Sequence, residues 1–197
     1  ENIERLKIAN CEVLCGEATG ESASPADAVL VDAPCSGTGT LGRRIDSRWK
    51  FDLGARERVS QEVAELKRIH PRQLFAHQAS RQLRLLLNAA ELVKDGGRVV
   101  YSTCTLEPEE NEHVVERFLK KRPDFTIEDP QPFVPSMFTD GRFVRTLPHR
   151  HGIDGAFAVR FAKKGGGAEK MRAEEEQELP AMDGSMKMDM EIAEELV

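Results

Sequence analysis

The sequence has few aromatic residues, few cysteines and no long apolar run. Aromatic side chains make up 6% of its 197 residues, with one Trp and one Tyr, and there are four Cys. No stretch reaches the about 20 consecutive apolar residues of a membrane-spanning helix, so we expect no membrane partner. The chain begins at Glu1 and shows no secretory signal pattern, so we expect it to be a piece of a longer protein. Four cysteines in an acidic chain without such a signal favour a reducing compartment.

The sequence also lacks an excess of positive charge. It holds 28 basic and 34 acidic residues, but ten of the acidic and only three of the basic residues lie in 168–197. Residues 1–167 are therefore close to neutral, and net charge neither requires nor excludes a nucleic-acid partner. Three glycines at 165–167 lead into the acidic segment, so we predict a folded domain over 1–164 and a flexible acidic tail over 165–197.

A metal centre is not expected from the cysteine spacing. Cys11 and Cys15 are followed by no His or Cys pair with the spacing of zinc ligands. We expect both to be small buried residues beside a short strand at 12–14.

Apolar runs alternate with amphipathic stretches along the domain, which predicts an α/β fold. Val29, Leu30 and Val31 form an apolar run typical of a strand buried on both faces in a parallel sheet. A helical pattern separates this run from a second strand at 98–102, so a crossover would make the two strands parallel neighbours. The remaining pattern predicts the end of a helix at 1–10, helices at 55–70, 72–93 and from Pro108 to an end at 120–123, a turn at 94–97, a strand at 125–127, and an antiparallel pair at 142–147 and 156–161.

A carboxylate and two thiols follow these two strands. Asp32 ends the first run, Pro34 cannot continue a strand ladder, and Cys35 comes next. Cys104 follows the second strand in the same way. Ligands bind at the carboxyl ends of strands in open α/β sheets, so we expect Asp32, Cys35 and Cys104 to face one crevice.

The segment after Cys35 is basic and carries the only tryptophan. One interpretation is a solvated loop with a half-buried indole; the other is a surface that contacts phosphates and stacks on bases. We favour the second because two candidate active-site thiols lie nearby. The residues concerned are Arg43, Arg44, Arg48, Trp49 and Lys50.

Two thiols and a carboxylate suit one particular reaction. A thiolate that adds to carbon 6 of cytosine turns the ring into an enamine, which can take an electrophile at carbon 5. A carboxyl group can hydrogen-bond ring N3 and the exocyclic amine. A second thiol could assist when the carbon 5 proton and the first thiol leave.

Two motifs resemble those of a known family. The stretches Asp32–Gly39 (DAPCSGTG) and Tyr101–Glu112 (YSTCTLEPEENE) closely resemble the two cysteine motifs of RNA 5-methylcytosine methyltransferases, which include the bacterial 16S rRNA enzyme and its nucleolar and transfer-RNA relatives. The resemblance runs from about Ile3 to Lys163. It implies methylation of RNA, ribosomal RNA first, with S-adenosylmethionine as cofactor, in the bacterial cytoplasm or in a eukaryotic nucleolus or organelle. The implied fold is a Rossmann-like sheet, mostly parallel with a C-terminal antiparallel pair, whose first strands are missing.

The same resemblance implies residue roles. Cys104 is the nucleophile and Cys35 assists product release. Asp32 contacts the cytosine and, with Pro34, borders the cofactor pocket. Glu17 matches a position near the adenine where the family usually has Asp. The glycine-rich cofactor loop of the family should precede this chain, so we expect the chain alone to bind S-adenosylmethionine weakly or not at all.

Other interpretations stay open. The chain could be a non-catalytic RNA-binding fragment of such an enzyme, or belong to a transfer-RNA-directed member. Cys35 and Cys104 could instead form a reversible disulfide in a thiol redox protein. Cys104 could also be a small core residue, since cysteine is often buried.

Overall fold

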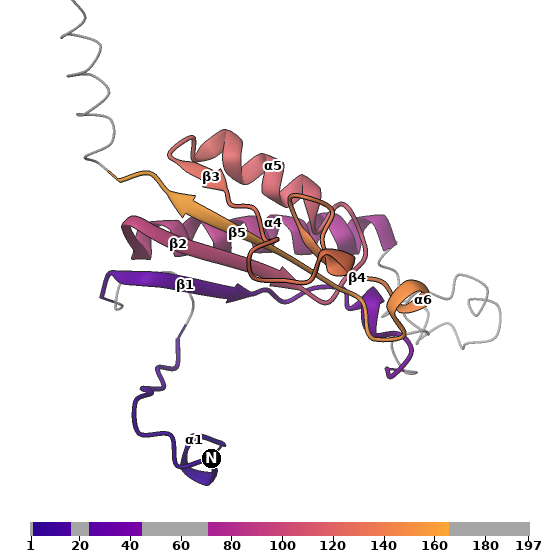
Figure 1. The fold of residues 1–197 in the computed structure, drawn as a ribbon, viewed down its shortest axis with the longest axis horizontal. Helices are drawn as coiled ribbons and strands as arrows, with labels where there is room; N and C mark the ends of the chain where they lie inside the picture. Colours follow the sequence, from indigo (N-terminus) through magenta and orange to yellow (C-terminus); the bar gives the residue numbers. More distant parts are fainter. Residues whose placement is uncertain (1, 17–23, 45–70, 166–197) are drawn as a thin grey trace, which may run out of the picture. The chain divides into compact units, whose positions relative to one another are not determined.

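The computed structural model describes residues 2–16, 24–44 and 71–165, which hold a five-stranded sheet and two long helices (Figure 1). The main elements are β1 (Ala26–Asp32), α4 (Pro71–Leu92), β2 (Val93–Thr103), α5 (Glu112–Lys121), β3 (Phe125–Ile127), β4 (Val144–Thr146) and β5 (Ala156–Lys163). The short helices are α1 (Asn2–Arg5), η1 (Thr38–Thr40), η3 (Ser136–Phe138) and α6 (Pro148–His151).

The sheet has the strand order β1-β2-β5-β3, and β4 also pairs with β5. β1 and β2 are parallel, whereas the β2–β5, β3–β5 and β4–β5 pairs are antiparallel. The α/β class, the parallel neighbours and the antiparallel pair near the end of the domain are therefore confirmed. The sheet of the described residues is mixed, with one parallel pair, where the sequence predicts a mostly parallel sheet.

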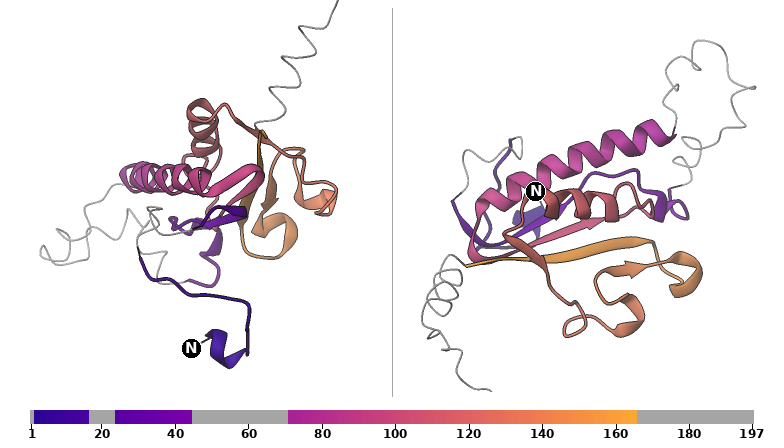
Figure 2. Two further views of the ribbon diagram at one scale, coloured as in Figure 1. Left: turned by 90° about the vertical axis from the view of Figure 1, so that its left-hand side faces the viewer. Right: turned by 90° about the horizontal axis from the view of Figure 1, so that it is seen from above.

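The core lies between the sheet and the two long helices, which pack side by side (Figure 2). Apolar residues of α4 and α5 recur at helical spacing and form the buried face of each helix. Every second residue from Gly97 to Thr103 of β2 and from Phe157 to Phe161 of β5 is buried in the same core, as strand geometry requires. The buried residues of these four elements include Leu83, Leu86, Ala90, Val99, Tyr101, Val114, Val115, Phe118, Phe157, Val159 and Phe161.

β1 is not buried on both faces, which corrects the prediction from its apolar run. Val29 and Val31 pack against the core, but Leu30 between them is 69% exposed. β1 lies at the edge of the described sheet, paired with β2 alone, and α4 contacts it from one side. Alternate residues therefore face away from the core.

The predictions for residues 11–15 are also wrong. Residues 12–14 form no strand, and both Cys11 and Cys15 are exposed. An apolar run becomes a strand only when a neighbouring strand supplies hydrogen-bond partners, and Val13 is instead 73% exposed.

The element boundaries differ most from the predicted ones at three places. The helix expected over 1–10 is the short α1. α5 begins at Glu112, because residues 108–111 form turns instead of a first helical turn. The expected turn at 94–97 lies inside β2, where the register with β1 jumps from Val93 to Arg98.

Several predictions lie outside the described residues: the helix at 55–70, the candidates Glu17, Arg48, Trp49 and Lys50, and nearly all of the tail over 165–197. No helix in the described part is both long enough and apolar enough to cross a membrane.

Candidate active site

The parallel pairing of β1 and β2 brings the two cysteine loops to the same end of the sheet. Asp32 pairs with Ser102, so the two strands end level with each other. The Ala33 N–H donates to the Ser102 carbonyl at 2.9 Å and continues the pairing by one residue. The chain then turns into the loops that carry the two thiols.

Cys35 and Cys104 are in direct contact. Their Sγ atoms lie 3.2 Å apart, and the Cys104 N–H donates to the Cys35 Sγ at 3.3 Å. Both cysteines are free thiols and half-buried. The structure therefore places the two sulfurs in one site, as the sequence predicts.

The environment of Cys35 favours its protonated form. Burial raises the pKa of the Cys35 thiol from 9.0 to about 12, and the hydrogen bond with Cys104 adds to this rise. A charged thiolate loses hydration when it is buried, which disfavours ionisation. Cys35 therefore keeps its proton at neutral pH and can donate its S–H to the Cys104 sulfur.

Asp32 and Pro34 lie exposed where β1 ends. The Ser102 Oγ donates a hydrogen bond to the Asp32 Oδ1 at 3.1 Å and orients the Asp32 carboxylate. Ser102 lies in the paired strand β2, two residues before Cys104. Both residues are thus accessible to a ligand at the carboxyl end of the sheet. Their roles toward cytosine and cofactor stay predictions.

Hydroxyl groups link the two cysteine loops. The Thr105 Oγ1 lies 2.8 Å from the Ser36 Oγ and 2.9 Å from the Thr38 Oγ1. The Leu106 N–H also donates to the Thr38 Oγ1 at 3.0 Å. Sequence reasoning missed these contacts, although small hydroxyl residues beside both cysteines were a visible signal.

Two buried polar side chains were also missed. Gln82 of α4 and Glu110, in the turn before α5, are both fully buried and lie 2.7 Å apart, measured from Nε2 to Oε2. The sequence pattern places Glu110 among the acidic residues of a helix start. Its position behind the Cys35 loop follows from tertiary packing.

Of the five predicted RNA-binding residues, the structure describes Arg43 and Arg44. Both are exposed, and Arg43 forms an ion pair with Asp154. A cavity of about 520 Å³ adjoins this pair and shares Gly39 with the Cys35 loop. Its lining residues are Gly39, Gly42, Arg43, Pro148, Gly152, Ile153 and Asp154.

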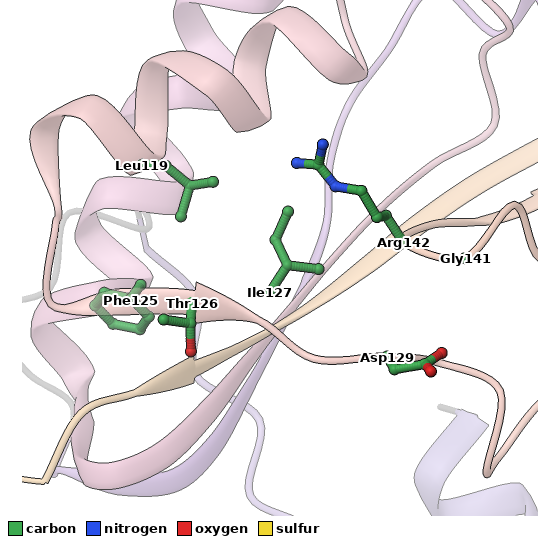
Figure 3. Close-up of a pocket in the computed structure, with 7 residues that line it drawn as sticks. All are labelled: Leu119, Phe125, Thr126, Ile127, Asp129, Gly141 and Arg142. Carbon is green, nitrogen blue, oxygen red and sulfur yellow. The ribbon is translucent and has the colours of Figure 1, made fainter. Parts of the chain in front are cut away.

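A second cavity, of about 430 Å³, lies away from the cysteine motifs (Figure 3). Leu119 of α5, residues of β3 and Arg142 surround it, and none of its lining residues belongs to the two cysteine loops. Among the described residues, no three His, Cys, Asp or Glu side chains are grouped to hold a metal ion.

Comparison with known proteins gives consistent matches. The family model described as 16S rRNA methyltransferase RsmB/F matches residues 1–162. The chain is 36% identical over 173 residues to the probable ribosomal RNA small subunit methyltransferase B of Bacillus subtilis, covering 81% of this chain and 33% of that protein. It is 32% identical over 184 residues to the 25S rRNA (cytosine-C(5))-methyltransferase nop2 of Schizosaccharomyces pombe, covering 82% and 26%.

Solved structures agree with these matches. NSun6 from Pyrococcus horikoshii, solved with SFG, superposes with a TM-score of 0.60 at 26% identity, covering 82% of this chain and 37% of that one. A methyltransferase homologue from the same organism gives a TM-score of 0.56 at 27% identity, covering 82% and 48%. The chain spans about a third of the length of the curated relatives it matches.

Proposed function

The chain belongs to the 16S rRNA methyltransferase RsmB/F family, and on this premise we propose that the intact protein methylates carbon 5 of a cytosine in ribosomal RNA. One relative is named as an rRNA (cytosine-C(5))-methyltransferase, and others as ribosomal RNA small subunit methyltransferases. These names favour ribosomal over transfer RNA as substrate. A bacterial protein would then act in the cytoplasm and a eukaryotic one in the nucleolus.

The contact between the Cys35 and Cys104 sulfurs is the observation that carries the proposal. The thiols come from two separate loops at the carboxyl end of a parallel strand pair, where an α/β sheet binds its ligands. A structural cysteine needs no such partner. A reaction that both forms and breaks a sulfur–carbon bond has a use for two adjacent thiols.

Cys104 acts as the nucleophile in the proposed mechanism. Its thiolate forms a bond to carbon 6, and the electron pair of the carbon 5–carbon 6 double bond becomes available at carbon 5. The exposed Asp32 carboxyl group hydrogen-bonds the cytosine edge and favours this charge redistribution. Asp32 and Pro34 would border the site of S-adenosylmethionine, which would supply the methyl group to carbon 5 and leave as S-adenosylhomocysteine.

Cys35 assists release. The proton on carbon 5 passes to water, its electron pair restores the ring double bond, and the carbon 6–sulfur bond breaks toward Cys104. The protonated Cys35 thiol, in contact with Cys104, donates a hydrogen bond to the departing sulfur and stabilises its charge, so that Cys104 returns to the thiolate form. This order of events makes Cys104 essential for bond formation and Cys35 important only afterwards.

Trapping experiments with the intact protein test this assignment. Cys104→Ala should abolish methyl transfer and covalent capture on RNA that contains 5-azacytidine. Cys35→Ala should instead let a covalent complex accumulate on unmodified RNA. Cys11→Ala, at an exposed cysteine outside the site, serves as the control.

Undiminished turnover in Cys104→Ala would end the assignment. A thiol redox function predicts a reversible disulfide between Cys35 and Cys104 and no RNA complex with either variant. Fast alkylation of both thiols in the presence of oxidant would count against that alternative.

RNA contact is proposed for the basic surface beside the Cys35 loop. Arg43 and Arg44 are exposed there, and Arg43 lines the cavity that reaches Gly39. Phosphate contacts of this kind set the register of a nucleic acid without reading its sequence.

A further inference from the structure

We propose that Glu110 is a positioning residue that holds the Cys35 thiol beside Cys104. The inference rests on the proposed function for the role of Cys35 in product release. The geometry on which it depends is independent of that role. Glu110 is a buried carboxylate that the proposed mechanism does not use, and the inference gives it a positioning role.

The Glu110 carboxylate binds the Cys35 loop directly. Its side chain is fully buried, and its Oε2 accepts a hydrogen bond from the Ser36 N–H at 3.0 Å. Ser36 immediately follows Cys35, so this bond fixes the peptide unit on the C-terminal side of the thiol. Hydrogen bonds to a charged group are stronger than those between neutral groups.

Gln82 connects Glu110 to the backbone on the N-terminal side of Cys35. Its Nε2 donates to the Glu110 Oε2 at 2.7 Å and to the Pro34 carbonyl at 3.0 Å. Pro34 immediately precedes Cys35. The carboxylate and the amide therefore hold the backbone on both sides of Cys35.

The turn that carries Glu110 is tied to the Cys104 segment. The Tyr101 hydroxyl donates to the Glu110 carbonyl at 2.6 Å, from a side chain that is itself fully buried. The next residue, Asn111, accepts from the Thr103 Oγ1 at 2.7 Å and donates from Nδ2 to the Thr105 carbonyl at 3.0 Å. One short turn thus fixes Cys104 through its neighbours and Cys35 through Ser36.

A purely structural role predicts a different outcome from a positioning role. Replacing Glu110 with an apolar residue leaves the Ser36 N–H and the Gln82 Nε2 without their acceptor, which lowers stability whatever the role of Glu110. A loss of stability therefore does not distinguish the two roles. If Glu110 positions Cys35, its loss should change the reactivity of the Cys35 thiol more than that of the Cys104 thiol.

Thiol labelling measures this difference without RNA or cofactor. In a Cys11→Ser/Cys15→Ser background, the rates at which iodoacetamide labels Cys35 and Cys104 are followed by peptide mass spectrometry. Glu110→Leu removes both hydrogen bonds to Oε2, and we expect the ratio of the Cys35 rate to the Cys104 rate to rise about tenfold. Glu110→Gln keeps an oxygen that can accept both bonds and should restore a ratio near that of the parent.

Two further variants serve as a control and as an alternative test in this experiment. Glu116→Leu makes the same substitution at an exposed position of α5 and should leave the ratio unchanged. If Glu110→Leu does not fold, Gln82→Met removes the donor to Pro34 at similar volume and should raise the ratio in the same direction. An unchanged ratio in every folded variant of Glu110 and Gln82 would overturn the inference.

Catalysis by the intact protein gives the second readout. With RNA substrate, Glu110→Leu should form the Cys104 complex at close to the parent rate but release product about tenfold more slowly, and Glu110→Gln should recover release. Equal losses in formation and release would show a general structural role and refute positioning. If the parent protein forms no RNA complex at all, the proposed function fails, while the labelling ratio still decides whether Glu110 positions Cys35.

Discussion

Replacing Gly39 with alanine should separate the two cysteine loops. The Gly39 N–H donates to the Cys104 carbonyl at 3.0 Å, and the Gly39 carbonyl accepts from the Gly155 N–H at 2.8 Å. A Cβ atom on Gly39 would come within 2.8 Å of the Cys104 oxygen and closer still to the Gly155 oxygen. Both obstacles are backbone atoms, which cannot rotate away as a side chain can.

The size of the effect follows from these contacts. Carbon and oxygen atoms without a bond between them settle at about 3.5 Å, so the Cys104 backbone must retreat by roughly half an ångström or more. Overpacking of this kind costs about 1–3 kcal/mol of unfolding free energy. A misplacement of about 1 Å can reduce turnover roughly 100-fold, so we expect a loss of between about 10-fold and 100-fold in formation of the RNA complex.

Gly42→Ala is the matched control. Gly42 lies three residues farther along, is exposed, and has no atom within 4 Å of the place that a Cβ atom would take. Urea unfolding and covalent capture on 5-azacytidine RNA should therefore distinguish the two variants. Gly39→Ala should lose both stability and capture, and Gly42→Ala should lose neither. A Gly39→Ala protein with the unfolding midpoint and capture rate of Gly42→Ala would refute the steric argument.

Two more predictions concern the ionisation of Cys35 and the contact with RNA. Because the pKa of Cys35 is raised to about 12, its labelling by iodoacetamide at pH 8 should be at least about tenfold slower than that of the exposed Cys11, and should still be rising at pH 10. A labelling rate that levels off below pH 10 would contradict the raised pKa of Cys35. The folded state favours the protonated thiol, so the contribution of Cys35 to stability is present below pH 9.0 and is lost as the pH rises toward 12. Arg44→Gln should weaken RNA binding and reduce the slope of the logarithm of the binding constant against log salt by about 0.7–0.9, the value for one lost phosphate contact. An unchanged slope would show that Arg44 does not contact an RNA phosphate.

Local patterns predicted the elements that have strong signals of their own. The regular apolar spacing of α4 and α5 depends on residues within a few turns of one another, so both helices were predicted with small errors at their ends. The run at 12–14 has a similar apolar character but forms no strand, because a strand exists only if a distant segment pairs with it. The same dependence on neighbours explains why Leu30 is exposed although its run is apolar.

The sequence by itself determined which residues carry the candidate chemistry and on which loops they lie, since both cysteine motifs are continuous stretches that follow apolar runs. Only the tertiary structure decided that the two sulfurs touch and that Glu110 and Gln82 meet behind the Cys35 loop. Ser36 and Glu110 are 74 residues apart, and Gln82 and Glu110 are 28 apart. Contacts over such separations depend on strand register and on how helices pack against the sheet. Neither the register nor the packing can be predicted from a local sequence pattern.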